Sequence, residues 1–378
     1  MDKVKYIALN VRGVRDQTKR QAVFKWISNQ KANICFLSET YITHDIVDNV
    51  NTDWTGLCYH SYGIKHAKGA SRGVSILVKN NIPFTFLDEI TSEDGRKLIV
   101  NCDIGGTKFS LISIYAPNSK KERVNFFADV KRCLNDIELH NIIMGGDFNT
   151  VVDKHLDKKG GLPAETHSSK ALTKHLINHF NLFDPWRTQN PTKQHFTHKQ
   201  VNPLILTRID FWLVSKKLQT DIISSNIIPS IRTDHRAITF EFHVKQISKG
   251  KGFWRLNTSI LDNKEYQNGI IELIDNVTKE YAHSEIEKRL LWDLLKIKCK
   301  EFSIKFSYKL SHERMSEVTR LQTQLEVIEK EMGFIEELIE LNGNSNTNFK
   351  GLPYFYDVQV RNIEAVLIVV LRMTKRDD

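Results

Sequence analysis

Short runs of apolar, largely β-branched residues, separated by polar stretches and turns, dominate the first 244 residues of the 378-residue chain. Such runs are typical of buried strands, and they lie at 6–11, 33–37, 74–78, 98–100, 109–114 and 142–144. Apolar residues spaced three or four apart predict helices between them, one capped by Thr18, one around 121–139 and one around 168–180. Strands that alternate with helices predict an α/β or α+β domain of enzyme size.

The pattern changes after residue 244, where a polar, glycine-containing segment at 246–252 indicates a domain boundary. We therefore predict a first domain at 1–244 and a linker at 245–284. From 318 to 339, apolar residues alternate steps of three and four, which predicts a helical segment at 285–342. It is either a coiled coil, through which the chain could self-associate or pair helices, or a helical hairpin that packs on itself or on the next domain. Residues 343–378 form a poorly defined tail.

The basic excess of the chain is confined to the predicted first domain. Residues 1–244 contain 33 Lys and Arg against 24 Asp and Glu, whereas residues 245–378 contain 21 of each. A basic excess in one domain favours an anionic partner such as a phosphate backbone. No apolar stretch approaches the roughly 20 residues of a membrane span, and the first residues lack the apolar run of a signal peptide. We expect an intracellular protein that does not contact a membrane.

Polar residues that the strands do not need follow four of the predicted strands. They are Asn10, Glu39, Tyr115 and, within the segment 145–149, Asp147 and Asn149. An Asp or Asn after a strand is, taken alone, more often a turn former or a helix cap. Because ligands of α/β sheets gather at strand ends, however, several such residues together are candidates for one shared site.

Two further segments, 208–214 and 233–238, add Asp210 and the adjacent Asp234 and His235 to these candidates. An adjacent Asp-His pair can serve a metal, a buried salt bridge or a phosphate. The whole set is rich in oxygen and contains no cysteine. It therefore suits a hard ion, Mg²⁺ or Mn²⁺, and disfavours zinc.

The order of these motifs resembles that of the endonuclease/exonuclease/phosphatase superfamily. Within it, the chain resembles the apurinic-type endonuclease domain of non-LTR (LINE-type) retrotransposon second-frame proteins, truncated before the reverse transcriptase. The matching segments, in chain order, are 9–13, 37–40, 72–74, 114–118, 145–149, 208–210 and 233–235. The resemblance covers about residues 3–244 and implies a four-layered α/β sandwich, in which two packed mixed β-sheets are flanked by helices. The C-terminal α-helical segment is added to this sandwich.

The resemblance also implies phosphodiester hydrolysis with a divalent metal, by a DNA endonuclease that nicks one strand and leaves a 3′ hydroxyl, as in target-primed retrotransposition. It makes Glu39 the principal metal ligand, with Asn10 and Asp234 near the ion. Asp147 would orient or deprotonate the attacking water. Asn149 and Tyr115 would contact the phosphate, and His235, held by Asp210, would hydrogen-bond a phosphate oxygen. A nuclear location, or otherwise a cytoplasmic one, fits this function.

Contacts with DNA are expected from basic and polar residues beside the site motifs. The candidates are Arg12, Lys158, Thr197, Lys199, Asn202 and Thr233. Residues 197–206 correspond to a hairpin that approaches the DNA groove in the family, although an ordinary polar surface loop is an equally good interpretation. Two positions depart from the family pattern: Thr233 replaces the usual serine, and His198 replaces the usual tryptophan after Phe-Thr.

Two alternative functions remain open from the sequence. The first is an abasic-site endonuclease or 3′ exonuclease, similar to exonuclease III, of the same superfamily. The second is an inactive element fragment that only binds nucleic acid or pairs helices. An intact set of motifs speaks against an idle site.

Overall fold

The structure is a computed structural model that describes residues 2–163, 166–244, 256, 258–282 and 287–343. In the last helix, the side chains at 315, 318, 322, 325, 326 and 328–343 are outside the described part. The chain divides into two compact units, Met1–Gly250 and Lys251–Asp378.

Two mixed sheets form the centre of the first unit. The first has the spatial order β16 (Ile222–Ile228), β17 (Ala237–Val244), β1 (Asp2–Asn10), β2 (Ile34–Ser38), β6 (Val74–Lys79) and β3 (Gly56–Ser61). The second has the order β12 (Leu182–Phe183), β15 (Asp210–Ser215), β10 (Asn141–Asp147), β9 (Thr107–Tyr115), β8 (Lys97–Ile104) and β7 (Phe84–Thr91). In each sheet two central strands are parallel, β1 with β2 and β9 with β10, and the other strand pairs are antiparallel.

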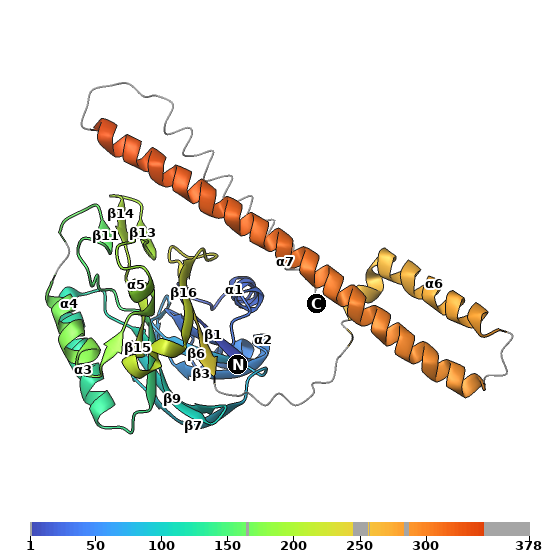
Figure 1. Cartoon of the computed structure of the whole chain (residues 1–378). Coiled ribbons are helices and arrows are strands. Elements are labelled where there is room, and N and C mark those ends of the chain that lie inside the picture. Colours follow the sequence, from blue (N-terminus) through green and yellow to red (C-terminus); the bar gives the residue numbers. More distant parts are fainter. Residues whose placement is uncertain (1, 164–165, 245–255, 257, 283–286, 344–378) are drawn as a thin grey trace. The chain divides into compact units, whose positions relative to one another are not determined.

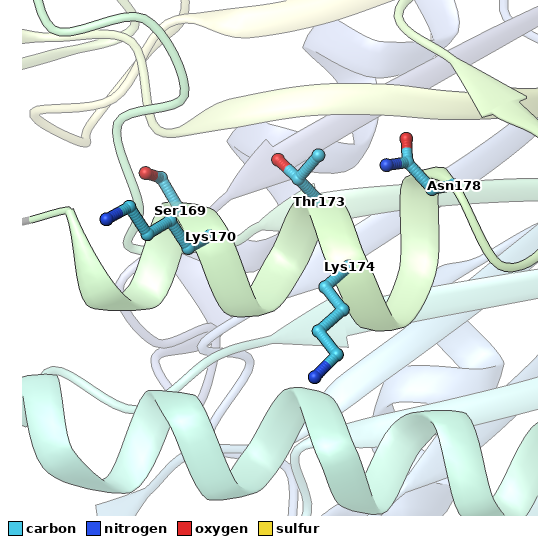
Figure 2. Close-up of a pocket in the computed structure, with 5 residues that line it drawn as sticks. All are labelled: Ser169, Lys170, Thr173, Lys174 and Asn178. Atoms are coloured by element: carbon cyan, nitrogen blue, oxygen red, sulfur yellow. The ribbon is translucent and has the colours of Figure 1, made fainter.

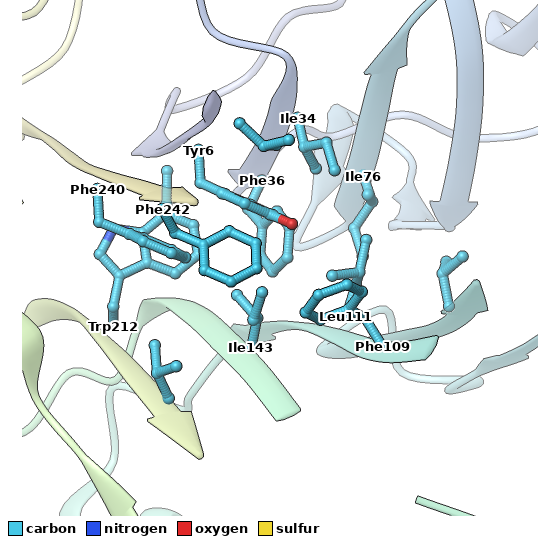
Figure 3. Close-up of a cluster of buried hydrophobic side chains, with 14 of the residues drawn as sticks. Tyr6, Ile34, Phe36, Ile76, Phe109, Leu111, Ile143, Trp212, Phe240 and Phe242 are labelled. Carbon is cyan, nitrogen blue, oxygen red and sulfur yellow. The ribbon is translucent and has the colours of Figure 1, made fainter. Parts of the chain in front are cut away.

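Aromatic side chains fill the space between the two sheets (Figure 3). Tyr6 stacks on Phe240 with ring centroids 4.6 Å apart, and Trp212 meets Phe36 edge to face at 5.1 Å. All these rings are almost completely buried. Truncation of a buried ring of this size costs about 3–5 kcal/mol, so this layer holds the two sheets together and fixes their strand ends.

Helices cover the outer faces of both sheets, which makes four layers, as predicted. In Figure 1, α1 (Gln17–Asn29) and α2 (Val47–Asp53) lie on one side of the paired sheets, and α3 (Lys120–Asn135) and α4 (His167–Leu172) on the other. Strands such as β2 are buried at every position because both faces are covered. The prediction that Thr18 caps the first helix was wrong. Asp16 caps it, and its side chain accepts from the Lys19 amide at 2.7 Å.

A smaller sheet of β11 (Lys158–Lys159), β14 (Ile205–Thr207) and β13 (His198–Gln200) extends beyond the second sheet. β13 and β14 form the predicted hairpin. The remaining elements of this unit are the β4 (Ile64–His66) and β5 (Gly69–Ser71) pair, α5 (Pro185–Gln189) and the 3₁₀ helix η2 (Lys216–Asp221). The small sheet pairs β11, which lies beyond the loop after Asp147, with β14, which ends shortly before Asp210, so both of its connections lead to the candidate site.

The second unit is helical in the part that the structure describes. It contains η3 (Thr258–Asp262), α6 (Lys264–Glu280) and the 56-residue α7 (Lys288–Gly343). Tyr266 of α6 packs against Phe302 and Phe306 of α7. These contacts agree with helices that pack on each other. Most side chains of the predicted coiled-coil seam lie outside the described residues, so that interpretation stays a prediction.

α4 continues into the π-helical turn η1 (Thr173–Ile177), and a surface pocket lies along these two elements; Figure 2 draws the residues that line it. Its lining is Ser169, Lys170, Thr173, Lys174 and Asn178, none of which is a predicted site residue. Within the described residues, no helix combines the length and apolar character that crossing a membrane requires.

Candidate active site

The ends of β1, β2, β9 and β10 bring the predicted polar residues to one edge of the sandwich. Asn10 ends β1, Glu39 follows β2, Tyr115 ends β9 and Asp147 ends β10. Within the second sheet, Asp147 is the register partner of Tyr115 on one side and of Asp210 on the other. Parallel central strands place their carboxyl ends at the same edge, which is why residues far apart in sequence meet here.

Asn10 joins the two sheets at this edge. Its Nδ2 donates to Glu39 Oε1 and to Asp147 Oδ2, both at 3.0 Å. Asn10 is completely buried, and its Oδ1 accepts from the Arg12 amide at 3.1 Å. One side-chain amide therefore fixes the spacing between two carboxylates that belong to different sheets.

Glu39 is half-buried and oriented by one tyrosine. The Tyr41 hydroxyl donates to Glu39 Oε2 at 2.9 Å, and the Tyr115 hydroxyl feels the Glu39 charge. Burial is the main cause that raises the pKa of both tyrosine hydroxyls, and the negative charge of Glu39 is the second. The pKa of Tyr41 rises to about 12, and the pKa of Tyr115 rises more. Both tyrosines therefore stay neutral donors at physiological pH.

The backbone at the site adopts strained conformations. Arg12, Glu39 and Asn149 have φ of 46°, 51° and 48°, a region that residues other than glycine rarely occupy. Hydrogen bonds between the loops that follow β1 and β2 hold this arrangement, for example Gly13 N to Glu39 O at 2.6 Å. Non-glycine residues in this region cluster at functional sites.

Asp147 is buried, and both of its oxygens have partners. Oδ2 accepts from Asn10, and Oδ1 accepts from the Asn149 amide at 2.8 Å. Burial, followed by the charge of Asp210, raises the pKa of Asp147 well above the usual range of an aspartate. The Asn149 Nδ2 donates to Ala116 O and to Asn118 Oδ1, both at 2.9 Å. A phosphate contact by this amide would therefore replace one of these bonds.

His235 and Asp210 form the expected pair, with Nδ1 and Oδ2 separated by 2.9 Å. Burial by itself favours the neutral ring. The charge and hydrogen bond of Asp210, with Asp147 and Asp234 nearby, outweigh burial and raise the pKa of His235 to about 10. Asp147, Asp210 and His235 are all buried, and their potential ligand atoms lie within 4.8 Å of one another. The pair thus provides an imidazolium beside the Asp147 carboxyl.

Asp234 lies at the exposed mouth of the site. It accepts from Arg12 Nη1 at 2.7 Å, and His198 Nε2 is 3.6 Å from the same Asp234 oxygen. Burial opposes ionisation, but the nearby His198 ring and the charges of His235 and Arg12 lower the pKa of Asp234 to about 2. The Thr233 hydroxyl donates to Asn10 O at 2.8 Å. The threonine that replaces the family's serine is therefore accommodated, and it ties this loop to β1.

Besides Arg12 and Thr233, which lie beside Asp234 and Asn10, the predicted nucleic-acid contacts fall into two groups. Lys158 on β11, Lys199 on β13 and Asn202 in the turn between β13 and β14 belong to the small sheet, and Asn202 is exposed. Thr197, by contrast, is 1% exposed, and its hydroxyl accepts from the amides of Ile209 and Asp210, both at 3.1 Å. Its observed role is to anchor the hairpin to the start of β15.

The structure brings together the predicted residues Asn10, Glu39, Tyr115, Asp147, Asn149, Asp210, Asp234 and His235. Sequence reasoning missed the role of Tyr41, which orients Glu39, and of Asn118, which holds Asn149. Asn118 lies within a motif that the sequence does reveal. Tyr41 carries no local signal, because its contact depends on the positive φ of 51° at Glu39 and 56° at Tyr41 itself.

A family model described as Endonuclease/Exonuclease/phosphatase family matches residues 7–235. The transposon TX1 uncharacterized 149 kDa protein of Xenopus laevis is 25% identical over 335 residues, which is 87% of this chain. The chain spans only 25% of that relative's length. The relative is itself a transposon protein, as the resemblance to retrotransposon proteins predicted.

Two solved structures are similar in fold. AP endonuclease LMAP from Leishmania major matches with a TM-score of 0.53 and 14% identity, over 64% of this chain and 88% of that one. The catalytic domain of Xenopus laevis APE2 matches with a TM-score of 0.50 and 17% identity, over 63% of this chain and 91% of that one. At these identities the likeness shows the shared α/β sandwich. The family match, which spans every candidate site residue from Asn10 to His235, shows that this chain belongs to the Endonuclease/Exonuclease/phosphatase family.

Proposed function

We propose that this chain is a divalent-metal-dependent DNA endonuclease that nicks one strand of a duplex and leaves a 3′ hydroxyl. The proposal rests above all on Asn10, whose amide donates to both Glu39 and Asp147. Two carboxylates held by one amide differ in burial, because Glu39 is half-buried while Asp147 is 1% exposed. Unequal environments divide carboxylates between two roles, here metal binding and proton transfer.

The donor set fits Mg²⁺ or Mn²⁺. Glu39, Asn10 and Asp234 offer carboxylate and amide oxygens, the ligands that hard divalent ions prefer. Glu39 would be the principal ligand, because its carboxylate is partly exposed and already oriented by Tyr41 at 2.9 Å. When bound, the ion supplies positive charge that offsets the negative charge developing on the phosphoryl oxygens.

Asp147 is suited to orient and deprotonate the attacking water. Hydrogen bonds from Asn10 and from the Asn149 amide fix the direction of its two oxygens. Its raised pKa makes it a stronger base than an ordinary aspartate. A carboxylate that is both fixed and more basic accepts a proton from water more readily than a mobile surface one.

His235 is suited to donate a hydrogen bond to a non-bridging phosphate oxygen. Asp210 engages Nδ1 and favours the protonated ring, which leaves Nε2–H for the substrate. A preorganised donor of this kind stabilises the charge of the transition state. The neutral hydroxyl of Tyr115, next to Asp147 in the sheet, is a second donor at the same edge.

Basic residues around the site favour a nucleic-acid substrate over a small phosphate ester. Arg12 lies at the mouth of the site, while Lys158 and Lys199 lie on the small sheet beside it. A row of cations next to a phosphodiesterase site neutralises several phosphates of one backbone. The Xenopus laevis relative is a transposon protein, which supports DNA as the nucleic acid.

A nicking assay tests the proposal. With Mg²⁺, the wild type should convert supercoiled plasmid to open circles, and Glu39→Gln should lower the rate by at least about 10²-fold, because the substitution removes the ligand charge. Glu138→Gln, at a side chain that is 84% exposed, is the matched control and should retain the wild-type rate. Equal rates for Glu39→Gln and the wild type would refute the assignment.

The products and substrates distinguish the alternatives. A DNA polymerase should extend the nick without prior phosphatase treatment, which demonstrates the 3′ hydroxyl. Much faster cleavage of an abasic duplex than of intact DNA would replace our proposal with an abasic-site endonuclease. DNA binding without metal-dependent cleavage, on several substrates, would instead indicate an inactive fragment.

A further inference from the structure

We propose that His198, Asp234 and His235 form a second metal site, for a transition-metal ion of the zinc class, at the mouth of the active site, and that it shares Asp234 with the proposed Mg²⁺ site. The potential ligand atoms of these three residues lie within 4.8 Å of one another. His198 occupies the position after Phe-Thr where the family pattern usually has a tryptophan. The third ligand of the cluster is therefore a residue in which this chain departs from that pattern.

Backbone pairing brings the two histidines together. His198 and His235 form an isolated antiparallel bridge between the hairpin and the loop that leads to β17 (Ala237–Val244). The Arg236 amide donates to Thr197 O at 2.7 Å, which fixes the register of this bridge. The two imidazole rings lie with their centroids 4.7 Å apart and an interplanar angle of 43°. The pairing is therefore a built feature of the fold and does not depend on chance side-chain rotation.

Neighbouring groups orient each ring so that one nitrogen faces the cluster. Asp210 engages His235 Nδ1 at 2.9 Å, and the Thr207 hydroxyl lies 3.5 Å from His198 Nδ1. His198 Nε2 points toward Asp234, 3.6 Å from Oδ2. Histidine ligands of metals usually have their second ring nitrogen engaged by a carboxylate, a carbonyl or another polar group. Both rings show this arrangement.

The ligand chemistry selects a different ion from the one that Glu39 and Asn10 would bind. Two imidazole nitrogens and one carboxylate favour Zn²⁺, Co²⁺ or Ni²⁺, whereas Mg²⁺ prefers oxygen ligands. The ion would compete with Arg12 for Asp234. Arg12 is 56% exposed in its side chain and contacts that carboxylate through one nitrogen, and an exposed ion pair of this kind contributes little energy. Arg12 can therefore turn toward solvent.

Occupancy of this site would inhibit cleavage, a consequence that rests on the proposed function. The ion would displace the Nε2 proton of His235 to solvent and bind that nitrogen, the atom that we assign to the phosphate, and it would also engage Asp234. Low concentrations of zinc-class ions should therefore slow Mg²⁺-dependent nicking by competing for these two side chains.

Cobalt binding tests the site without reference to activity. The tag-free full chain is titrated with Co²⁺ in excess Mg²⁺, and the visible absorption of bound cobalt is recorded. His198→Gln should weaken cobalt affinity by roughly tenfold or more, and so should His198→Phe, which keeps an aromatic ring beside His235. His179→Gln is the control, since His179 is exposed and contacts Asn135. If both His198 variants bind cobalt as tightly as the wild type, the site does not exist.

Nicking assays then separate this inference from the proposed function. Zn²⁺ should inhibit the wild type at concentrations roughly tenfold lower than those that inhibit His198→Gln. If the wild type binds cobalt through His198 but never nicks DNA with Mg²⁺, the proposed function fails and the metal site stands. If the wild type nicks DNA but the His198 variants bind cobalt as tightly as the wild type, the metal site fails and the proposed function stands.

Discussion

Arg208 provides the sharpest test of how the site is supported, because it is a buried cation bound by two carboxylates. Its side chain is 2% exposed. Nε and Nη2 contact the two oxygens of Asp157 at 2.7 and 3.1 Å, and Nη1 contacts Asp184. Asp157 is completely buried and lies after the loop that follows Asp147. Arg208 lies two residues before Asp210. The pair therefore ties the segment after Asp147 to the segment before Asp210.

We expect Arg208→Met to lower the free energy of unfolding by about 3–5 kcal/mol, because it leaves the buried Asp157 and the half-buried Asp184 without their shared cation. Arg187 still contacts Asp157, so the lower half of this range is the better expectation. Arg208→Lys keeps the charge but loses the two-pronged contact and should cost less, about 1–3 kcal/mol.

Urea unfolding followed by tryptophan fluorescence measures these changes, since Arg208 also lies over the Trp186 ring at 5.2 Å. Arg132→Met is the control. Arg132 is 73% exposed and pairs with Asp129 on the surface of α3, so its loss should change stability by no more than about 0.5 kcal/mol. A loss below about 1 kcal/mol for Arg208→Met would refute the view that this network holds the small sheet to the site.

Three further predictions follow from particular contacts. Gly146→Ala should lower the free energy of unfolding in urea by about 2–4 kcal/mol, because φ is +135° and a Cβ would lie 2.1 Å from Ile114 O. Gly106→Ala is the control: φ is +84° but the space around it is open, so the loss should be about 1 kcal/mol. Equal losses for the two variants would contradict this reasoning. Burial lowers the pKa of His60 to about 4, so between pH 6.5 and 4 the unfolded chain takes up a proton that the folded chain rejects. The stability advantage of the wild type over His60→Gln should therefore shrink by about 2–3 kcal/mol as the pH falls from 7.5 to 4.5, and a constant difference would contradict it. EDTA should abolish nicking and added Mg²⁺ or Mn²⁺ should restore it, whereas full activity in EDTA would exclude the proposed role of Glu39, Asn10 and Asp234.

Local patterns in the sequence predict much of the first unit. The apolar runs at 33–37, 74–78 and 142–144 correspond to β2, β6 and β10, because strands covered on both faces must be apolar at nearly every position. The strand at β7 (Phe84–Thr91) was not predicted. It lies at the edge of the second sheet, most of its residues are exposed, and Asp88 and Glu89 interrupt any apolar run. The helix start at Asp16 was missed because Thr18 offers an equally good capping side chain nearby.

The sequence by itself determined which residues end the strands, and hence the candidates Asn10, Glu39, Tyr115 and Asp147, since strand periodicity and motif order are local properties. Only the tertiary structure decided how these residues are connected. Asn10 meets Asp147 across 137 positions, and His198 lies beside His235 through one backbone bridge. Both contacts depend on the register of strands and on the aromatic layer that fixes one sheet against the other. Register and sheet packing are set by the sum of many long-range contacts, and no local pattern specifies them.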